Sequence, residues 1–240
     1  MAARRRVGVL GGMGPEATVL FMQRVIERTE VTDDQDHVPL LVDNNPQVPS
    51  RVKAIVDGTG ADPGPVLAAM ARRLEAAGAE ALAMPCNTAH HFAPGIRDAV
   101  CLPFLDMVAL SARRLAEAGV RRVGILASPA IRITGVFERP LAEHGVAPLY
   151  DRGEEDALAA IRAVKVRDYE PARRTLATAA AAFERAGADA LLVACTEFSI
   201  LTEAARNVLP LVDTIDVLAE EVVAFSCAPA TVVNGLARKT

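Results

Sequence analysis

The feature that most constrains this chain is an internal repeat that ends on a cysteine. The segment Glu75–Thr88, EAAGAEALAMPCNT, returns as Glu184–Glu197, ERAGADALLVACTE, and seven of the fourteen positions are identical. In each copy a helical pattern ends at a glycine, an apolar strand follows, and a cysteine stands where that strand meets polar residues. The repeat predicts two equivalent half-structures. Cys86 and Cys195 then lie on the two sides of whatever binds between the halves.

Two further pairs of segments extend the repeat along the chain. Arg5–Leu10 reads RRVGVL and Arg121–Leu126 reads RRVGIL, while Leu102–Asp106 reads LPFLD and Leu209–Asp213 reads LPLVD. All three pairs fall in the same order and at nearly the same spacing, which a chance match would not produce. The repeat therefore covers two homologous halves of the chain.

These halves define the expected domains. We predict an N-terminal half over residues 1–105 that carries Cys86 and a second half over residues 106–213 that carries Cys195, with the active site between them. A helix over residues 214–226 is a candidate to pack back on the first half. Continuous apolar runs that alternate with helical patterns are typical of parallel strands buried on both faces. We therefore expect an α/β fold of two similar, doubly wound parallel-sheet domains related by pseudo-twofold symmetry. The predicted strands are Val7–Leu10, Pro39–Asp43, Ala81–Met84, Pro103–Leu105, Val123–Ala127, Ala147–Leu149, Ala190–Ala194 and Leu211–Val212.

Charge and hydropathy argue against several classes of protein. The net charge is −4, and no long basic run is present, so a nucleic-acid partner is not expected. The basic start is followed only by the short apolar run Val7–Leu10, and no stretch approaches the ~18 apolar residues of a membrane span. We expect a cytoplasmic protein without a membrane partner.

The cysteines are expected to be free thiols, and no metal is expected. An α/β protein in a reducing compartment has no need of disulfides, and the cysteines and histidines are too scattered for a zinc site. Either thiol alone is most simply a small buried hydrophobic residue. Both, however, precede polar pairs, Asn87-Thr88 and Thr196-Glu197, which can hydrogen-bond a substrate or a thiolate. Two thiols facing one ligand can take a proton from one face of a carbon and return a proton to the other.

A glycine turn follows the first strand. Gly11–Pro15 reads GGMGP and opens a helix, but it lacks the third glycine of a dinucleotide fingerprint and the lysine of a P-loop. Free backbone N–H groups at such a helix start are suited to an anion such as a carboxylate. A plain tight turn explains the same residues, and both interpretations stay open.

Four stretches together resemble a known family. They are GGMGPEAT (Gly11–Thr18), NNPQVPSR (Asn44–Arg51), MPCNTAH (Met84–His90) and CTE (Cys195–Glu197). The chain is similar to the cofactor-independent aspartate/glutamate racemases, most of all to the aspartate racemase branch. The resemblance implies interconversion of L- and D-amino acids without pyridoxal phosphate or any other cofactor, by a protein that acts as a homodimer.

The resemblance also implies roles for individual residues. Cys86 and Cys195 would be the two catalytic bases, one on each face of the α-carbon. Arg51, with Lys165 as a second cation, would bind the side-chain carboxylate of an acidic amino-acid substrate. Glu197 is either a proton-relay partner of Cys195 or a hydrogen-bonding scaffold, and we favour the scaffold, because a carboxylate beside a thiolate raises the pKa of the thiol. The full set of predicted substrate-binding residues is Met13, Gln47, Arg51, Asn87, Thr88, Ser128, Lys165, Thr196 and Glu197.

Two alternatives remain for the function. The first is a racemase of glutamate, of another amino acid or of a hydantoin. The second, from a different class, is a non-catalytic amino-acid-binding protein on the same scaffold. A symmetric pair of thiols favours catalysis over binding, because a binding protein has no use for both.

Overall fold

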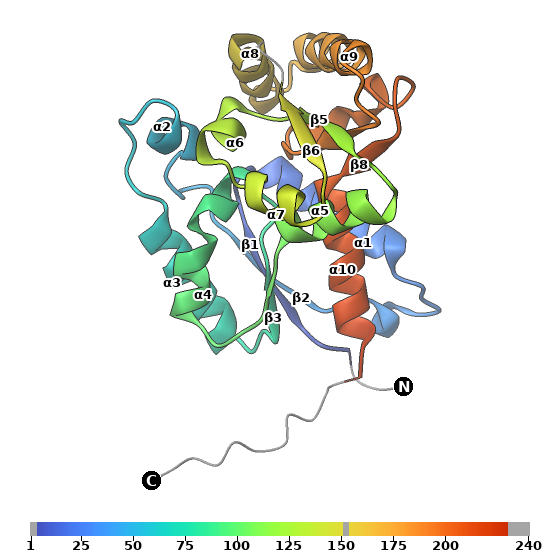
Figure 1. The fold of residues 1–240 in the computed structure, drawn as a ribbon. Helices are drawn as coiled ribbons and strands as arrows, with labels where there is room; N and C mark the ends of the chain where they lie inside the picture. Colours follow the sequence, from blue (N-terminus) through green and yellow to red (C-terminus); the bar gives the residue numbers. More distant parts are fainter. Residues whose placement is uncertain (1–3, 151–153, 230–240) are drawn as a thin grey trace.

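The computed structural model describes residues 4–150 and 154–229. Within these residues the strands form two four-stranded parallel sheets, ordered β2-β1-β3-β4 and β6-β5-β7-β8. The sheets lie in two lobes, one above the other in Figure 1. The predicted α/β fold with two similar parallel-sheet halves is confirmed. The strands are β1 (Val7–Gly11), β2 (Leu40–Asn44), β3 (Ala81–Ala83), β4 (Phe104–Leu105), β5 (Arg122–Leu126), β6 (Ala147–Tyr150), β7 (Ala190–Val193) and β8 (Leu211–Asp213).

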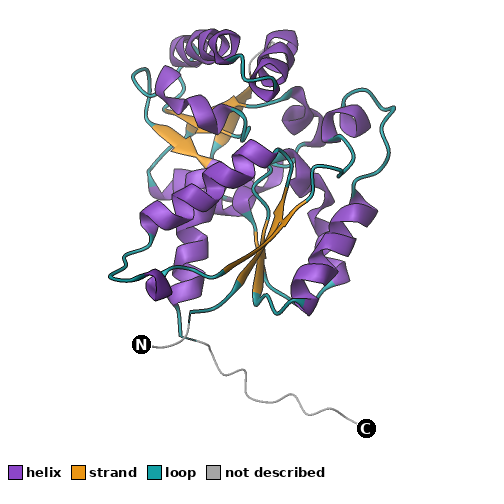
Figure 2. Ribbon diagram, turned by 180° about the vertical axis from the view of Figure 1, so that it is seen from behind, coloured by secondary structure: helices purple, strands orange, loops and turns teal. Residues whose placement is uncertain are grey.

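Helices cover both faces of each sheet, as Figure 2 shows from behind. Their bounds are α1 (Pro15–Arg28), α2 (Arg51–Ile55), α3 (Gly64–Ala76), α4 (Ala93–Ala99), α5 (Met107–Glu117), α6 (Pro129–Thr134), α7 (Glu138–Glu143), α8 (Glu154–Lys165), α9 (Tyr169–Arg185) and α10 (Thr214–Cys227), with the 3₁₀ helices η1 (Asp34–Asp36), η2 (Thr88–Phe92) and η3 (Phe198–Ala204). The first sheet packs between α1 with α10 and α3 with α4. The second packs between α8 with α9 and α5 with α7.

The first strand of each half, which is an inner strand of its sheet, carries a glycine at the same place in the repeat. A Cβ at Gly8 in β1 would lie 2.9 Å from the Ala79 Cβ, and one at Gly124 in β5 would lie 2.4 Å from the Phe183 Cγ. Both distances are shorter than van der Waals contact, so any larger residue would push the covering layer away. The repeated Val-Gly pair therefore allows close packing on an inner strand of each half.

The last described helix, α10, packs against the first half of the chain. Ile215, Leu218 and Val222 belong to the same buried core as Val7 of β1 and Phe21 of α1. In Figure 1 this red helix lies in the lobe of the first sheet, with the blue α1 beside it. The chain thus leaves the first half after β4, builds the second sheet and returns.

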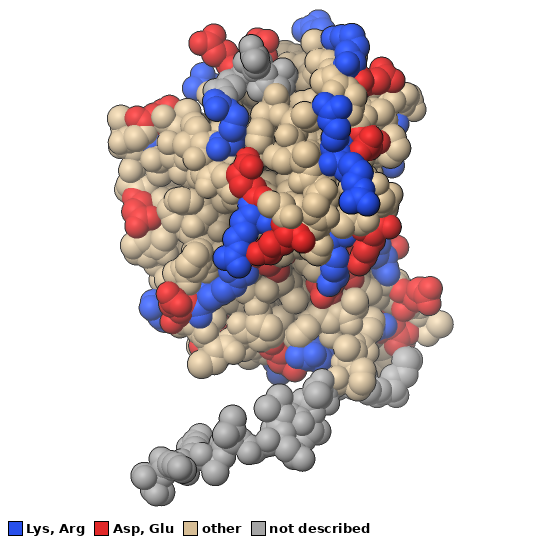
Figure 3. Space-filling view, in the orientation of Figure 1, with Lys and Arg blue, Asp and Glu red and all other residues tan. Residues whose placement is uncertain are grey.

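The surface carries charges of both signs. On the face drawn in Figure 3, Lys and Arg side chains are interspersed with Asp and Glu. Within residues 4–150 and 154–229, no helix is long and apolar enough to cross a membrane.

Candidate active site

The two cysteines occupy matching places at the carboxyl ends of the sheets. Cys86 follows β3 and precedes η2, and Cys195 follows β7 and precedes η3. Each side chain is buried, with 6% of the residue exposed. The sequence repeat therefore has a direct structural counterpart, because both thiols stand where the third strand along each half ends.

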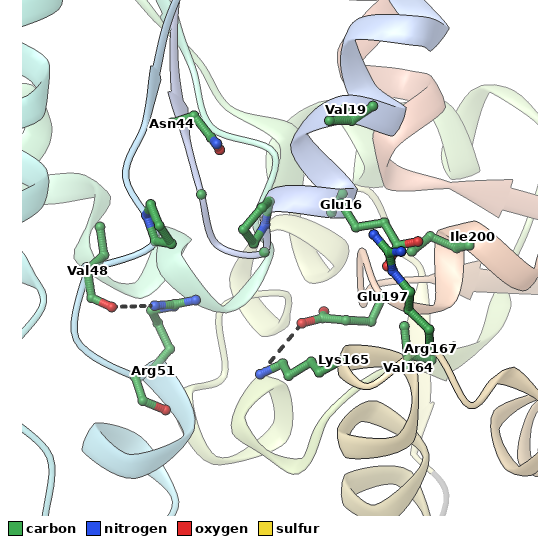
Figure 4. Close-up of a pocket in the computed structure, with 16 residues that line it drawn as sticks. Glu16, Val19, Asn44, Val48, Arg51, Val164, Lys165, Arg167, Glu197 and Ile200 are labelled. Atoms are coloured by element: carbon green, nitrogen blue, oxygen red, sulfur yellow. Dashed lines mark hydrogen bonds and ion pairs between the residues drawn. The ribbon is translucent and has the colours of Figure 1, made fainter.

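A cavity of about 860 Å³ opens between the two halves. The first half lines it with the loops that follow β1 and β2 and with the start of α1, and the second half with the end of α8 and the start of η3. Figure 4 shows Arg51 approaching from one side and Lys165 and Glu197 from the other. The lining residues are Gly12, Gly14, Pro15, Glu16, Ala17, Val19, Asn44, Pro46, Val48, Ser50, Arg51, Val164, Lys165, Arg167, Glu197 and Ile200.

The glycine turn packs tightly against the loop after β2. Gly12 has a φ of +89°, and a Cβ there would lie 2.3 Å from the carbonyl carbon of Asn45. Its N–H donates to the Thr18 hydroxyl at 2.9 Å. Gly12 therefore acts as a tight turn whose amide is already used. Gly14, which precedes α1, lines the cavity, so the start of α1 faces the ligand space.

Backbone carbonyls hold Arg51 in place. It is the first residue of α2, and its Nη1 donates to the carbonyl oxygens of Val48 at 3.1 Å and Pro49 at 2.8 Å. These bonds hold the guanidinium against the wall of the cavity, as Figure 4 shows for Val48. An arginine fixed in this way is preorganised to bind a carboxylate.

On the opposite wall, Glu197 connects a thiol to a cation. The Cys195 thiol donates to Glu197 Oε2 at 3.3 Å, and the Lys165 ammonium lies 3.8 Å from Glu197 Oε1. The Lys165 side chain is half exposed and Glu197 is mostly covered. The raised pKa of Cys195 favours the thiol as the donor in this hydrogen bond, and Lys165 lies close enough to balance the carboxylate charge.

The two thiols have different electrostatic surroundings. Burial raises the pKa of the Cys86 thiol, the positive charge of Arg51 opposes that rise, and Glu197 adds to it. Burial also raises the pKa of Cys195 well above its usual range, and Glu197 raises it further through its charge and its hydrogen bond. Glu197 thus acts on both thiols, whereas Arg51 favours a thiolate at Cys86.

Two polar side chains that follow strands have buried oxygen atoms without a hydrogen-bond partner among the described residues. The Asn87 amide donates to the Thr214 hydroxyl at 2.9 Å, but its Oδ1 is buried without a partner among the described residues. The Ser128 hydroxyl, just before α6, is likewise buried and unpartnered in that part of the chain. Thr196 is buried and Thr88 half-buried. Neither Asn87 nor Ser128 lines the cavity, but buried oxygens without a partner can form hydrogen bonds with a polar ligand that reaches them.

Of the predicted residues, Arg51, Lys165 and Glu197 line the cavity. The two cysteines and four of the predicted polar residues are not among its lining residues: Cys86, Cys195, Asn87, Thr88, Ser128 and Thr196. Met13 is 2% exposed and belongs to the same buried core as Cys86. Gln47 is exposed, its backbone N–H donates to Asn45 Oδ1 at 3.0 Å, and it does not line the cavity. The structure brings Arg51, Lys165 and Glu197 together at the cavity, whereas Met13 and Gln47 are not among its lining residues.

The structure also places residues at the site that we did not single out from the sequence. Glu16 and Arg167 line the cavity, and the Tyr169 hydroxyl donates to Glu16 Oε1 at 2.7 Å, which joins α9 to the start of α1. Glu16 stands inside the GGMGPEAT stretch, which is a signal for it, but no local pattern marks Arg167 or Tyr169. Within the described residues, no three His, Cys, Asp or Glu side chains gather so that they could hold a metal ion.

The structure thus defines a pseudo-symmetric α/β protein. It has two parallel-sheet halves, a buried cysteine at the same strand end of each half, and between the halves a charged cavity suited to a small polar ligand. The family model of the Asp/Glu/hydantoin racemases matches residues 10–222. The chain belongs to this family, and the resemblance inferred from its motifs is confirmed.

Individual relatives agree with the family. The aspartate racemase of Picrophilus torridus is 30% identical, covers 92% of this chain and 94% of its own, and superimposes with a TM-score of 0.84. The broad specificity amino-acid racemase RacX of Bacillus subtilis (strain 168) is 24% identical over 233 residues, which are 90% of this chain and 96% of that protein. The fold is shared with glutamate racemase from Francisella tularensis subsp. tularensis in complex with D-glutamate, at 15% identity, a TM-score of 0.66 and coverage of 92% of this chain and 81% of that chain.

Proposed function

We propose that the protein interconverts L- and D-aspartate without pyridoxal phosphate, by proton transfer between the α-carbon and two cysteines. The observation that carries the proposal is the matched placement of Cys86 and Cys195 after β3 and β7, with Glu197 acting on both thiols. The similarity to an aspartate racemase over nearly the whole chain supports the choice of reaction and substrate.

Proton transfer proceeds from one thiol to the other through the substrate. With one enantiomer bound, Cys86 as a thiolate removes the α-proton, and Cys195 as a thiol gives its proton to the opposite face. The α-ammonium group of the substrate brings a positive charge to the site, which lowers the pKa of a nearby thiol and lets the first proton leave to water. In the reverse direction the two cysteines exchange roles. Two groups are required because a single base would return the proton to the face from which it came.

Glu197 acts as a scaffold that favours the thiol form of Cys195. Its hydrogen bond from the thiol, 3.3 Å long, and its charge both disfavour the thiolate at Cys195, while Arg51 favours the thiolate at Cys86. Burial raises the pKa of both thiols, but that of Cys195 is raised further, so Cys86 is the thiol that gives up its proton more readily in the free protein. This difference between the thiols supports the scaffold role of Glu197 that the sequence favoured.

The charge of the cavity supports an acidic substrate. Arg51, Lys165 and Arg167 line it, against the two carboxylates of Glu16 and Glu197. Arg51 binds the side-chain carboxylate of aspartate, Lys165 gives a second positive charge, and the unpartnered Asn87 and Ser128 oxygens accept hydrogen bonds from the substrate ammonium. With this function we also propose a cytoplasmic homodimer that needs no cofactor.

The test is exchange of the α-proton. The purified protein, freed of pyridoxal phosphate, is incubated in heavy water with L-aspartate, L-glutamate, L-alanine and L-lysine in separate samples, and each α-proton signal is followed by NMR. We expect loss of the aspartate signal with formation of D-aspartate. Cys86→Ser and Cys195→Ser abolish racemisation, whereas Cys101→Ser, at an exposed cysteine, leaves it unchanged.

Each other outcome has a definite meaning. Equal loss of several signals identifies a broad-specificity racemase, as in the Bacillus relative, and overturns the choice of aspartate. Loss of the glutamate signal alone moves the specificity to that amino acid. Binding of aspartate without exchange of its α-proton overturns catalysis and favours an amino-acid-binding protein.

A further inference from the structure

Four residues after each catalytic cysteine stands a buried polar side chain to which the proposed proton transfer gives no role. His90 stands four residues after Cys86, and Ser199 stands four residues after Cys195. Both are buried, at 6% and 2% exposed. They are equivalent positions of the repeat, although one is an imidazole and the other a hydroxyl.

In the first half, His90 connects the backbone of Cys86 to the start of a helix. Its Nδ1 lies 2.8 Å from the Cys86 carbonyl oxygen, and its Nε2 lies 3.2 Å from the backbone N of Met107, the first residue of α5. The Met107 N–H must donate, so Nε2 is the acceptor and Nδ1 carries the proton. Burial lowers the pKa of His90, which agrees with this neutral tautomer. Its ring is thus a neutral bridge between the cysteine turn and α5.

In the second half, Ser199 makes the equivalent connection. Its backbone N–H donates to the Cys195 carbonyl oxygen at 3.2 Å, and its hydroxyl donates to Asp213 Oδ1 at 2.8 Å. Asp213 caps α10 by accepting the Ile215 N–H at 2.9 Å. The cysteine turn is again joined to the start of the helix that follows the last strand of its half. The corresponding cap of α5 is Asp106, which accepts from Val108 and Ala109.

We propose that His90 and Ser199 are positioning residues, each of which sets the orientation of one catalytic cysteine by joining its turn to a helix N-terminus. The inference rests on the proposed two-thiol function. Because each residue supports one thiol, each governs one of the two proton transfers. Transfer needs reacting atoms aligned to a fraction of an ångström, so loosening one turn raises one barrier and leaves the other nearly unchanged.

Isotope effects separate the two barriers. In ordinary water, deuterium on the α-carbon slows only the step that removes it, so L-[α-²H]aspartate reports one thiol and D-[α-²H]aspartate the other. The deuterium passes to the abstracting thiol, and the product receives hydrogen from the second. Since L- and D-aspartate have equal free energies, kcat/KM must fall equally in both directions for any variant. The isotope effects measured with the two enantiomers are not bound by this equality, so a variant can raise one and lower the other.

The variants are His90→Ala and Ser199→Ala, each measured in both directions. We expect kcat/KM to fall on the order of 10- to 100-fold in each variant. In His90→Ala the isotope effect rises for the enantiomer that Cys86 deprotonates and falls toward one for the other enantiomer. Ser199→Ala shows the opposite pattern. Ser199→Thr, which keeps the hydroxyl, restores most of the rate.

Controls keep the test decisive. Ser226→Ala removes another buried hydroxyl, which donates to the Arg5 carbonyl at 2.8 Å far along α10, and is expected to leave both isotope effects unchanged. If His90→Ala does not fold, His90→Asn keeps a donor for the Cys86 carbonyl, loses the acceptor for the Met107 N–H, and is expected to show the same shift.

Isotope effects that move in parallel, or not at all, in the two variants overturn the positioning inference while the proposed function stands. A wild-type protein that exchanges no α-proton overturns the proposed function itself.

Discussion

Asp213 allows a quantitative test of the electrostatics behind the second thiol. Its residue is 4% exposed, and burial raises the pKa of its carboxyl from 3.8 to about 7, with a further rise from Asp216 and an opposing effect of the Ser199 hydrogen bond. The native state therefore holds a proton that the unfolded state has already lost in this pH range. Since the unfolded state binds fewer protons, stability falls as pH rises from about 4 to about 7 and is level above that.

The perturbation is Asp213→Asn, which cannot titrate but still offers an N-cap oxygen to Ile215. In the native wild type, Asp213 keeps its proton up to a pKa of about 7, whereas the unfolded chain loses it at about pH 4. Between pH 5 and pH 8 the wild-type free energy of unfolding should therefore fall by about 2.5 kcal/mol relative to that of the variant. Nearly all of this change falls below pH 7.5. The assay is urea unfolding at pH 5, 6, 7 and 8, followed by far-UV circular dichroism, because the chain has no Trp and two Tyr.

The matched control is Asp106→Asn at the equivalent cap of α5. Burial acts to raise the pKa of Asp106, but His90, the Ala109 N–H and Arg97 together hold it below 3.8. The stability that ionised Asp106 contributes is therefore lost only as the pH falls below 3.8. From pH 5 to pH 8 the free energy of unfolding of Asp106→Asn should change in parallel with that of the wild type. The quantity to compare is the free energy of unfolding of the wild type minus that of Asp213→Asn. If this difference stays constant within about 0.5 kcal/mol across the range, Asp213 is ionised in the native protein and the reasoning is wrong.

Three further substitutions have expected outcomes. Gly124→Ala places a Cβ 2.4 Å from the Phe183 Cγ and should lower the urea-derived free energy of unfolding by about 1–3 kcal/mol; an unchanged midpoint would contradict the packing. Gly12→Ala forces apart the loops at Asn45 and should reduce kcat/KM for aspartate on the order of 100-fold in a racemisation assay; full activity would show that the turn does not shape the cavity. Arg51→Lys loses the paired bonds to two carbonyls and should raise KM for aspartate about tenfold, with a smaller change in kcat. An unchanged KM would argue against carboxylate binding by Arg51.

The repeat predicted the fold because it combined local and long-range information. An apolar strand such as Ala81–Ala83 is recognisable from its own residues, and its recurrence at Ala190–Val193 placed it in a second, equivalent sheet. The predicted strand ends differ from the observed ones by at most one residue, because hydrogen bonds to neighbouring strands decide where a strand stops. The sequence could also place a thiol after each of these two strands.

The contacts within the site were less accessible from the sequence. The hydrogen bond from Tyr169 to Glu16 joins residues that are 153 positions apart, and no local pattern records which helix start a distant hydroxyl will meet. The bridge from His90 to Met107 joins residues 17 positions apart, and no local pattern shows that this imidazole meets the start of α5. Gln47 was predicted at the site because its neighbours carry the family motif, but the Asn45 turn directs that residue outward.

The return of α10 to the first sheet has a consequence for how the chain acquires its structure. Ile215 and Leu218 complete the core around Val7, so that core stays open until more than two hundred residues of chain are available. The first sheet then has no complete hydrophobic core of its own at an earlier stage, and the two sheets should unfold in one cooperative transition. A chain cut after Asp213 would expose the apolar faces of β1 and α1 together and should aggregate. The helix that closes one lobe thus makes the two lobes a single folding unit.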